Sequence, residues 1–202
     1  MWNYEKRLQF PVHITKPCPK TASLIISQFG GPDGEMAASM RYLSQRYSMS
    51  CKEVGGLLTD IGTEELAHLE MICAIIYQLT KNITAEQAKA GGFDAYYIDH
   101  TSGLWPTAAA GIPFNACEFQ SKGDAITDLT EDLAAEQKAR TTYDNLIRMI
   151  DDPEVLAPLK FLRQRELVHF QRFGEALEKI KDKLDAKNFY YFNPEFDKQF
   201  VK

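Results

Sequence analysis

Apolar residues recur at steps of three and four along three long stretches of the chain, which is the spacing of helices that bury one face. The first stretch follows Ser50, and the other two lie on either side of Asp151-Asp152-Pro153. The pattern predicts helices over residues 51–80, 123–150 and 153–184. It rests on Val54, Leu57, Leu58, Ile61, Leu69, Ile72, Ile75, Ile76 and Leu79, then on Ile126, Leu129, Leu133, Tyr143, Leu146, Ile147 and Ile150, and then on Val155, Leu156, Leu159, Leu162, Phe170, Phe173, Leu177, Ile180 and Leu184.

Signals at the helix ends complete this pattern. Ser50 followed by Glu53 has the form of a capping box and predicts the start of the helix over 51–80. Asp152 is suited to cap the last helix and Pro153 to its first position, so the last two helices are expected to form an antiparallel hairpin. Upstream, the glycine-rich segment 30–34 interrupts an apolar stretch, and a further helix is predicted over 33–48.

A long segment from Lys81 to Gly123 separates the second and third of these four helices. One short helix is predicted after the Thr84-x-x-Gln87 box, and the remainder is expected to be irregular. Such a connection is uncommon, and in ferritin-like bundles it joins the two helix pairs. The expected fold is therefore all-α, a ferritin-like four-helix bundle with a long crossover between helices 2 and 3, in one domain over residues 1–202. The aromatic tail, 188–202, is expected to pack on the bundle or on a neighbour.

Charge and composition exclude several classes of partner. The net charge is −5 with no run of Lys and Arg, which argues against nucleic acid and against an anionic membrane surface. No stretch approaches the roughly 20 apolar residues of a membrane span, and the first residues lack the layout of a signal peptide. We expect a cytoplasmic protein.

Ionisable residues interrupt two of the apolar stripes. Glu65 and His68 fall between Ile61 and Leu69, and Glu166 and His169 fall between Leu162 and Phe170. Residues three apart share a helix face, so each Glu-x-x-His pair points into the predicted core. Because burial of an unpaired carboxylate is strongly unfavourable, these groups must neutralise, pair or bind a cation.

The spacing of two further glutamates indicates a dinuclear metal site. Glu35 precedes Glu65 by thirty residues, and Glu136 precedes Glu166 by the same thirty. Each half of the chain thus offers a helix with one inward glutamate and then a helix with Glu-x-x-His, which is the ligand set of di-iron and di-manganese bundles. Four carboxylates and two imidazoles suit such divalent metals and do not suit copper or an iron–sulfur cluster.

Other polar residues are interpreted as surface groups. Five acidic residues lie off the apolar stripes and are expected to be exposed: Glu53, Glu64, Glu70, Glu131 and Asp132. Arg140 and Tyr143 follow Glu136 by one and two turns, so they either line the site or extend outward from the bundle. We favour the second interpretation for both.

Several segments resemble the manganese catalase family, and the resemblance covers nearly the whole chain. They are Gly34-Glu35, Thr63-Glu64-Glu65-Leu66-Ala67-His68-Leu69-Glu70, Ala134-Ala135-Glu136 and Arg165-Glu166-Leu167-Val168-His169. The opening segment, 1–12, resembles the short spore-coat (CotJC-type) branch of that family.

The resemblance implies a role for each candidate residue. It implies two manganese ions per subunit, with Glu65 bridging them, and five direct protein ligands: Glu35, Glu65, His68, Glu136 and His169. It implies that Glu166 is held back from the metals as an acid/base. The implied reaction is disproportionation of hydrogen peroxide to water and dioxygen, with the pair alternating between Mn(II)₂ and Mn(III)₂. The resemblance also implies a homo-oligomer, a hexamer in the family, and a place in the cytoplasm or on the spore coat beside other coat proteins.

Two positions depart from the family pattern, and alternatives stay open. Some members carry a basic residue just before the third glutamate ligand or two turns after it, where this chain has Ala135 and Tyr143.

A di-iron oxidase or peroxidase is one alternative function, because nitrogen and oxygen ligands do not by themselves select manganese. A structural spore-coat protein that retains the metal site is the other.

Overall fold

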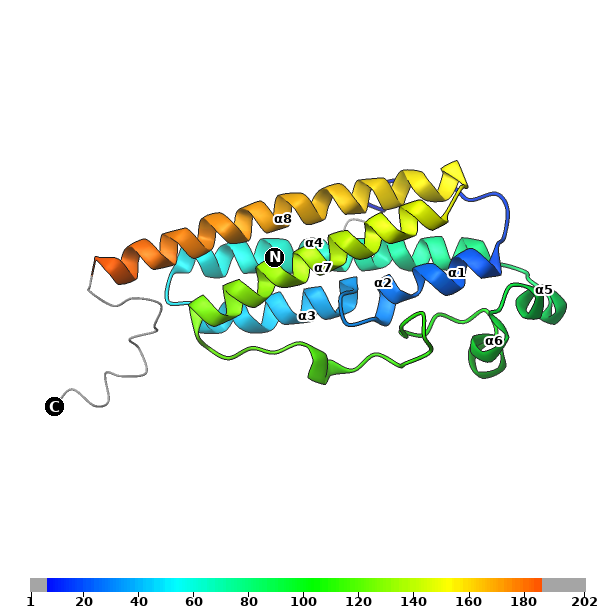
Figure 1. Ribbon diagram of the computed structural model, residues 1–202, viewed down its shortest axis with the longest axis horizontal. Helices are drawn as coiled ribbons and strands as arrows, with labels where there is room; N and C mark the ends of the chain where they lie inside the picture. Colours follow the sequence, from blue (N-terminus) through cyan, green and yellow to red (C-terminus); the bar gives the residue numbers. More distant parts are fainter. Residues whose placement is uncertain (1–6, 187–202) are drawn as a thin grey trace.

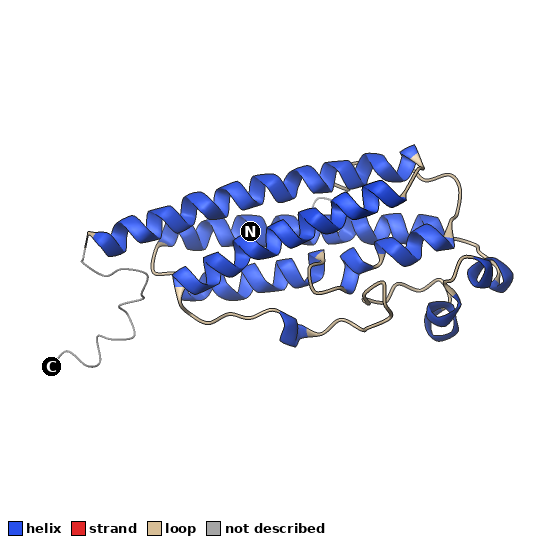
Figure 2. Cartoon of the chain, in the orientation of Figure 1, coloured by secondary structure: helices blue, strands red, loops and turns tan. Residues whose placement is uncertain are grey.

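The computed structural model describes residues 7–186, and within them it contains helices and no strand (Figure 2). The helices are α1 (Pro19–Ile25), α2 (Ser27–Gly30), α3 (Glu35–Gln45), α4 (Lys52–Thr80), α5 (Ala85–Ala90), α6 (Asp94–His100), α7 (Ala125–Met149) and α8 (Pro153–Asp185), with 3₁₀ turns at Arg46–Ser48 and Ala116–Glu118. The predicted all-α class is confirmed. No helix in the described part of the chain is long and apolar enough to cross a membrane. The aromatic tail, 188–202, lies outside the described residues.

Four helices, α3, α4, α7 and α8, form the bundle (Figure 1). The short helices α1 and α2 continue the line of α3 alongside α4, so that three pieces together match the length of one long helix. The chain returns along α4, crosses back over the length of the bundle, and then forms the α7–α8 hairpin. The crossover makes α4 and α7 run in the same direction, which confirms the ferritin-like arrangement with its long connection between the second and third bundle helices.

The helix ends agree with the capping signals at two places and differ at one. Thr84 and Gln87 form the predicted capping box, and the Asp152 side chain accepts a hydrogen bond from Glu154 N with Pro153 at the first helical position. The prediction for α4 is wrong in detail. Cys51, and not Ser50, is the N-cap residue; Glu53 lies 2.6 Å from the Cys51 Sγ instead of completing a box.

The crossover packs closely against the break between α2 and α3. A Cβ atom on Gly30 would lie 2.2 Å from Thr107 N, so only glycine allows this approach of the two backbones. The segment also contains α6, which the sequence pattern did not predict. The crossover is therefore fixed to the first helical line over much of its length.

Two apolar clusters divide the core. One contains Ile72, Ile75 and Leu162, and the other contains Ile61 and Phe173. On α4 and on α8, the Glu-x-x-His motif lies between residues of one cluster and residues of the other. The candidate site is thus a polar layer in the middle of the bundle, closed above and below by apolar side chains.

Candidate metal centre

The fold brings all six predicted site residues together in this polar layer. Each of the four bundle helices contributes: Glu35 from α3, Glu65 and His68 from α4, Glu136 from α7, and Glu166 and His169 from α8. Every one of these side chains is at most 3% exposed. Their burial follows from the three-residue spacing, which places both members of each motif on the inward face of one helix.

The ligand atoms form two groups that share two carboxylates. Glu35 and His68 belong to the first group, Glu136 and His169 belong to the second, and Glu65 and Glu166 belong to both. Within each group, one ligand atom from each residue lies within 4.8 Å of the others. This arrangement has the form of two adjacent cation positions with shared carboxylates.

Glu65 lies between the two histidines. The His68 Nδ1 is 2.7 Å from Glu65 Oε2, and the His169 Nδ1 is 2.7 Å from Glu65 Oε1. The imidazole rings stack with 5.5 Å between their centroids. Each oxygen of one carboxylate thus faces a different histidine, which is the placement that a bridging carboxylate requires.

A second carboxylate, Glu64, lies on the opposite side of both rings. His169 Nε2 is 3.0 Å from Glu64 Oε2, and His68 Nε2 is 3.6 Å from Glu64 Oε1. Arg165 and Gln9 hold this carboxylate in place, at 2.8 Å and 2.7 Å. The expectation that Glu64 is merely exposed charge is therefore wrong. A proton on Nε2 shared with Glu64 leaves Nδ1 free to bind a cation, a usual arrangement for histidine ligands.

Two buried tyrosines hold two of the remaining carboxylates, Glu136 and Glu35. The Tyr42 hydroxyl donates to Glu136 Oε1 at 2.5 Å, and the Tyr143 hydroxyl donates to Glu35 Oε1. Our interpretation of Tyr143 as a side chain that extends outward is wrong, because its ring is fully buried. The same interpretation is right for Arg140, which is partly exposed and bonds Gln137 and Asp144 along its own helix.

The electrostatics of the site follow from crowding four carboxylates in one core. Burial, reinforced by repulsion from Glu65, raises the pKa of Glu35 to about 7. Burial, and then the charges of the other three carboxylates, raise the pKa of Glu166 well above its usual value. For Glu65, attraction by the two histidines outweighs burial and lowers the pKa. Without a cation, protons must therefore neutralise part of the site.

The donor set fits a pair of divalent cations. Several deeply buried atoms make no hydrogen bond. Two of them, Glu65 Oε1 and His169 Nδ1, lie 2.7 Å apart without hydrogen-bond geometry, and the others are His68 Nε2, Glu136 Oε2 and Glu166 Oε1. Four of these five are carboxylate oxygens or Nδ1 atoms of the two groups, the positions that metal ions would satisfy. The groups contain only oxygen and nitrogen donors, which suits manganese or iron.

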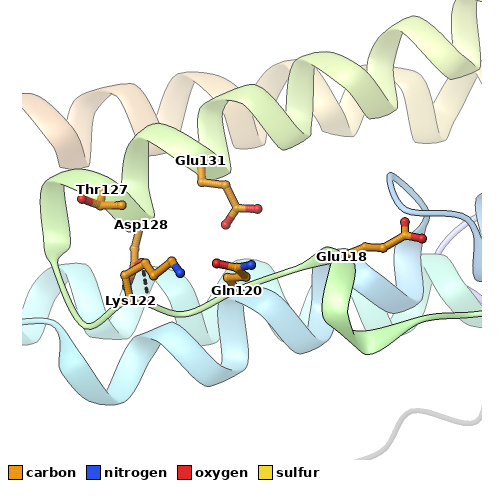
Figure 3. Close-up of a pocket in the computed structure, with 6 residues that line it drawn as sticks. All are labelled: Glu118, Gln120, Lys122, Thr127, Asp128 and Glu131. Carbon is orange, nitrogen blue, oxygen red and sulfur yellow. Dashed lines mark hydrogen bonds between the residues drawn. The ribbon is translucent and has the colours of Figure 1, made fainter.

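A separate polar cluster lies nearer the start of α7. Asp132 was expected to be exposed, but it is fully buried, and burial raises its pKa well above the usual value. Glu131 nearby is partly exposed and pairs with the buried Arg41 at 2.9 Å. A pocket of about 170 Å³ opens beside this cluster, where the crossover meets α7 (Figure 3). None of the six site residues is among those that line it: Glu118, Gln120, Lys122, Thr127, Asp128 and Glu131.

Comparisons with known proteins agree with this geometry. The family described as manganese containing catalase matches residues 1–202. Protein CotJC of Bacillus subtilis (strain 168) is 52% identical over 190 residues, which cover 94% of this chain and 100% of that protein. A probable manganese catalase of Clostridium acetobutylicum is 35% identical, over 94% of this chain and 85% of its own length.

A solved structure shows the same fold. Wild-type KatB, a manganese catalase from Anabaena, matches with a TM-score of 0.83 and 31% identity, over 89% of this chain and 81% of that one. With a family match across the whole length, the chain belongs to the manganese-containing catalase family and, within it, to the CotJC-type branch.

Proposed function

We propose that this protein is a dimanganese catalase, which disproportionates hydrogen peroxide to water and dioxygen. The observation that carries the proposal is the pair of buried ligand groups that share Glu65 and Glu166. Family membership supports manganese over iron for this pair.

Five residues would hold the metal ions. Glu35 and His68 would bind one ion, Glu136 and His169 would bind the other, and Glu65 would bridge them. When bound there, a manganese pair would supply the two-electron redox chemistry that the reaction needs. The two apolar clusters above and below the site keep bulk water away from the ligands.

Glu166 would move the protons. Reduction of peroxide to water consumes two protons, and oxidation of a second peroxide to dioxygen returns two. Glu166 is buried, its Oε1 has no hydrogen-bond partner, and repulsion by its neighbours favours the protonated carboxyl. A carboxyl group whose pKa is raised in this way can act as a general acid and base.

The first experiment measures metal content and dioxygen release on the same manganese-loaded sample. We expect close to two manganese ions per chain and dioxygen release on addition of peroxide. Glu65→Ala should lose both metal and activity. Glu166→Gln should keep the metal and lower kcat by roughly 100- to 10,000-fold, the usual contribution of a general acid/base.

A matched control keeps this result interpretable. Glu175→Gln changes an exposed glutamate on the same helix, α8, and should leave metal content and kcat unchanged. Iron at two atoms per chain with peroxide consumption and no dioxygen would point to a di-iron peroxidase instead.

A second candidate function is a structural coat role in which the metals stabilise the bundle. It is favoured by the 52% identity with Protein CotJC and by Ala135 and Tyr143, which stand where some family members carry a basic residue. A fully manganese-loaded protein that releases no dioxygen would select this role. Under either proposal we expect a homo-oligomer in the cytoplasm or on the spore coat, which light scattering and antibody labelling of spores would test.

A further inference from the structure

A second repeat in the chain accompanies the repeat of the metal motifs. Tyr42 follows Glu35 by seven residues, and Tyr143 follows Glu136 by the same seven. Seven residues make two helical turns, so each tyrosine lies on the same face of its helix as the glutamate that precedes it. Both rings are buried, at 1% and 0% exposure.

The hydrogen bonds of these tyrosines cross from one half of the chain to the other. Tyr42 on α3 donates to Glu136 on α7, and Tyr143 on α7 donates to Glu35 on α3. Each tyrosine therefore holds the glutamate of the opposite helix and not the glutamate of its own.

The two bonds involve equivalent oxygens and leave the other oxygen of each carboxylate facing a histidine. Tyr143 occupies Glu35 Oε1, and the other oxygen, Oε2, lies 3.6 Å from His68 Nδ1. Tyr42 occupies Glu136 Oε1, and Oε2 lies 3.7 Å from His169 Nδ1. In both halves the phenol fixes the outer oxygen, while the inner oxygen faces the ligand nitrogen of the histidine in its own metal group.

We infer that Tyr42 and Tyr143 are a crossed pair of positioning residues, each of which holds the terminal carboxylate of the opposite half in place for one metal ion. The inference rests on the proposed dimanganese site and adds Tyr143 to its machinery. It also accounts for the departure at position 143. At this position the neutral hydroxyl of Tyr143, and not a basic side chain, orients the Glu35 carboxylate. The two proposed metal positions then have alike surroundings, each with one tyrosine bonded to its terminal carboxylate.

The test is a manganese titration of metal-free Tyr143→Phe, Tyr42→Phe and the double variant, with the unbound ion followed by its electron paramagnetic resonance signal. We expect two ions of similar affinity in the unmodified protein. Each single variant should bind one ion as before and the other about 10- to 100-fold more weakly, the usual effect of removing a partner of a metal ligand. The double variant should weaken both.

Control measurements separate positioning from packing. Tyr77→Phe changes a half-exposed tyrosine on α4 and should leave the titration unchanged. Thermal unfolding of the metal-free variants is measured as well, because removal of a hydroxyl that only stabilised the fold would lower that stability and leave both affinities equal.

The outcomes distinguish this inference from the function on which it rests. An unmodified protein that binds no manganese would overturn the dimanganese proposal itself. An unmodified protein that binds two ions and releases dioxygen, beside a Tyr143→Phe variant with two unaltered affinities, would overturn the crossed pair alone.

Discussion

At the scale of the residue, the sequence identified the six side chains of the candidate metal centre but not the groups that hold them. The two Glu-x-x-His pairs were found because they interrupt apolar stripes, and Glu35 and Glu136 were found because each precedes one pair by the same thirty residues. Glu64 was missed because it lies off the stripe of α4, although it is four residues before His68 and thus within reach of the outer ring nitrogen. Contacts between helices, such as that of Glu64 with His169, are not encoded in any local spacing.

Asp132 and Tyr143 were misjudged for related reasons. Asp132 is one turn before Glu136 and shares its inward face, so the four-residue spacing could have indicated burial. The burial of Tyr143 was visible in its place on the apolar stripe, but its bond to Glu35 depends on how α3 and α7 pack.

Glu64→Gln is expected to weaken manganese binding by about 10- to 100-fold, because a neutral amide is a poorer partner for two histidine ligands than a carboxylate. Equilibrium dialysis against manganese measures the change. Asp60→Asn, at an exposed position on the same helix, serves as the control and should have no effect. An unchanged affinity in Glu64→Gln would show that the histidines do not depend on this carboxylate.

Manganese binding is expected to tighten as the pH rises through about 6 to 8, because protons compete with the metal for its ligands. In the metal-free protein the pKa of Glu35 is raised to about 7, and that of His68 is raised because the attraction of Glu65 outweighs burial. Raising the pH through about 7 removes the proton of Glu35, so the affinity must increase with pH and not decrease. Calorimetric titration in two buffers of different ionisation enthalpy counts the protons released, and a pH-independent affinity without proton release contradicts the expectation.

The same raised pKa makes the contribution of Glu35 to the stability of the metal-free protein depend on pH. The folded state binds a proton that the unfolded state releases above the ordinary value of 4.5, so this group's contribution to stability falls as the pH rises from 4.5 through about 7.

At the scale of the element, periodicity predicted the long helices, and local chemistry decided where they end. The helix α4 begins at Lys52 with Cys51 as its N-cap, one residue later than the predicted start at Cys51 with Ser50 as the cap. The first helical line needs a break between α2 and α3, since the segment 30–34 must leave room for the crossover. That need is set by residues 106–107, far away in the sequence, and no local pattern reveals it.

Gly30→Ala is expected to lower the free energy of unfolding by about 1–3 kcal/mol, because the new methyl group would meet the backbone of Pro106 and Thr107 at 2.2–2.3 Å. Urea denaturation of the metal-free protein measures the loss. Gly56→Ala is the matched control: its Cβ meets nothing within 4 Å, so on the exposed face of α4 it should stabilise by about 0.5–1 kcal/mol. Equal effects of the two substitutions would contradict the close approach at Gly30.

At the scale of the whole molecule, the long crossover was predictable from the length of the segment between two helices, and its consequence was predictable as well. It makes the two halves of the ligand set meet across the middle of the bundle. The metal site therefore links all four helices, and metal binding should be coupled to the stability of the entire fold.

Removal of manganese is expected to lower the unfolding temperature. With free metal at 100 times Kd, one bound ion stabilises the folded state by about 2.7 kcal/mol, which corresponds to a shift of roughly 5–10 °C for a chain of this size. Calorimetric scans with and without a chelator measure the shift. Glu65→Ala provides the reference, because its unfolding temperature should no longer respond to the chelator.

The crossed tyrosines also show that the two halves of the chain contribute the same kinds of residues to the site. Residues 125–185 alone contain a glutamate, a tyrosine seven residues later and a Glu-x-x-His motif, joined by a three-residue link at 150–152. Two copies of such a hairpin, paired about a twofold axis, would supply all six metal-facing groups and both phenols with no crossover at all. The candidate centre thus has a twofold repeat, because each half of the chain supplies one glutamate, one tyrosine and one Glu-x-x-His motif.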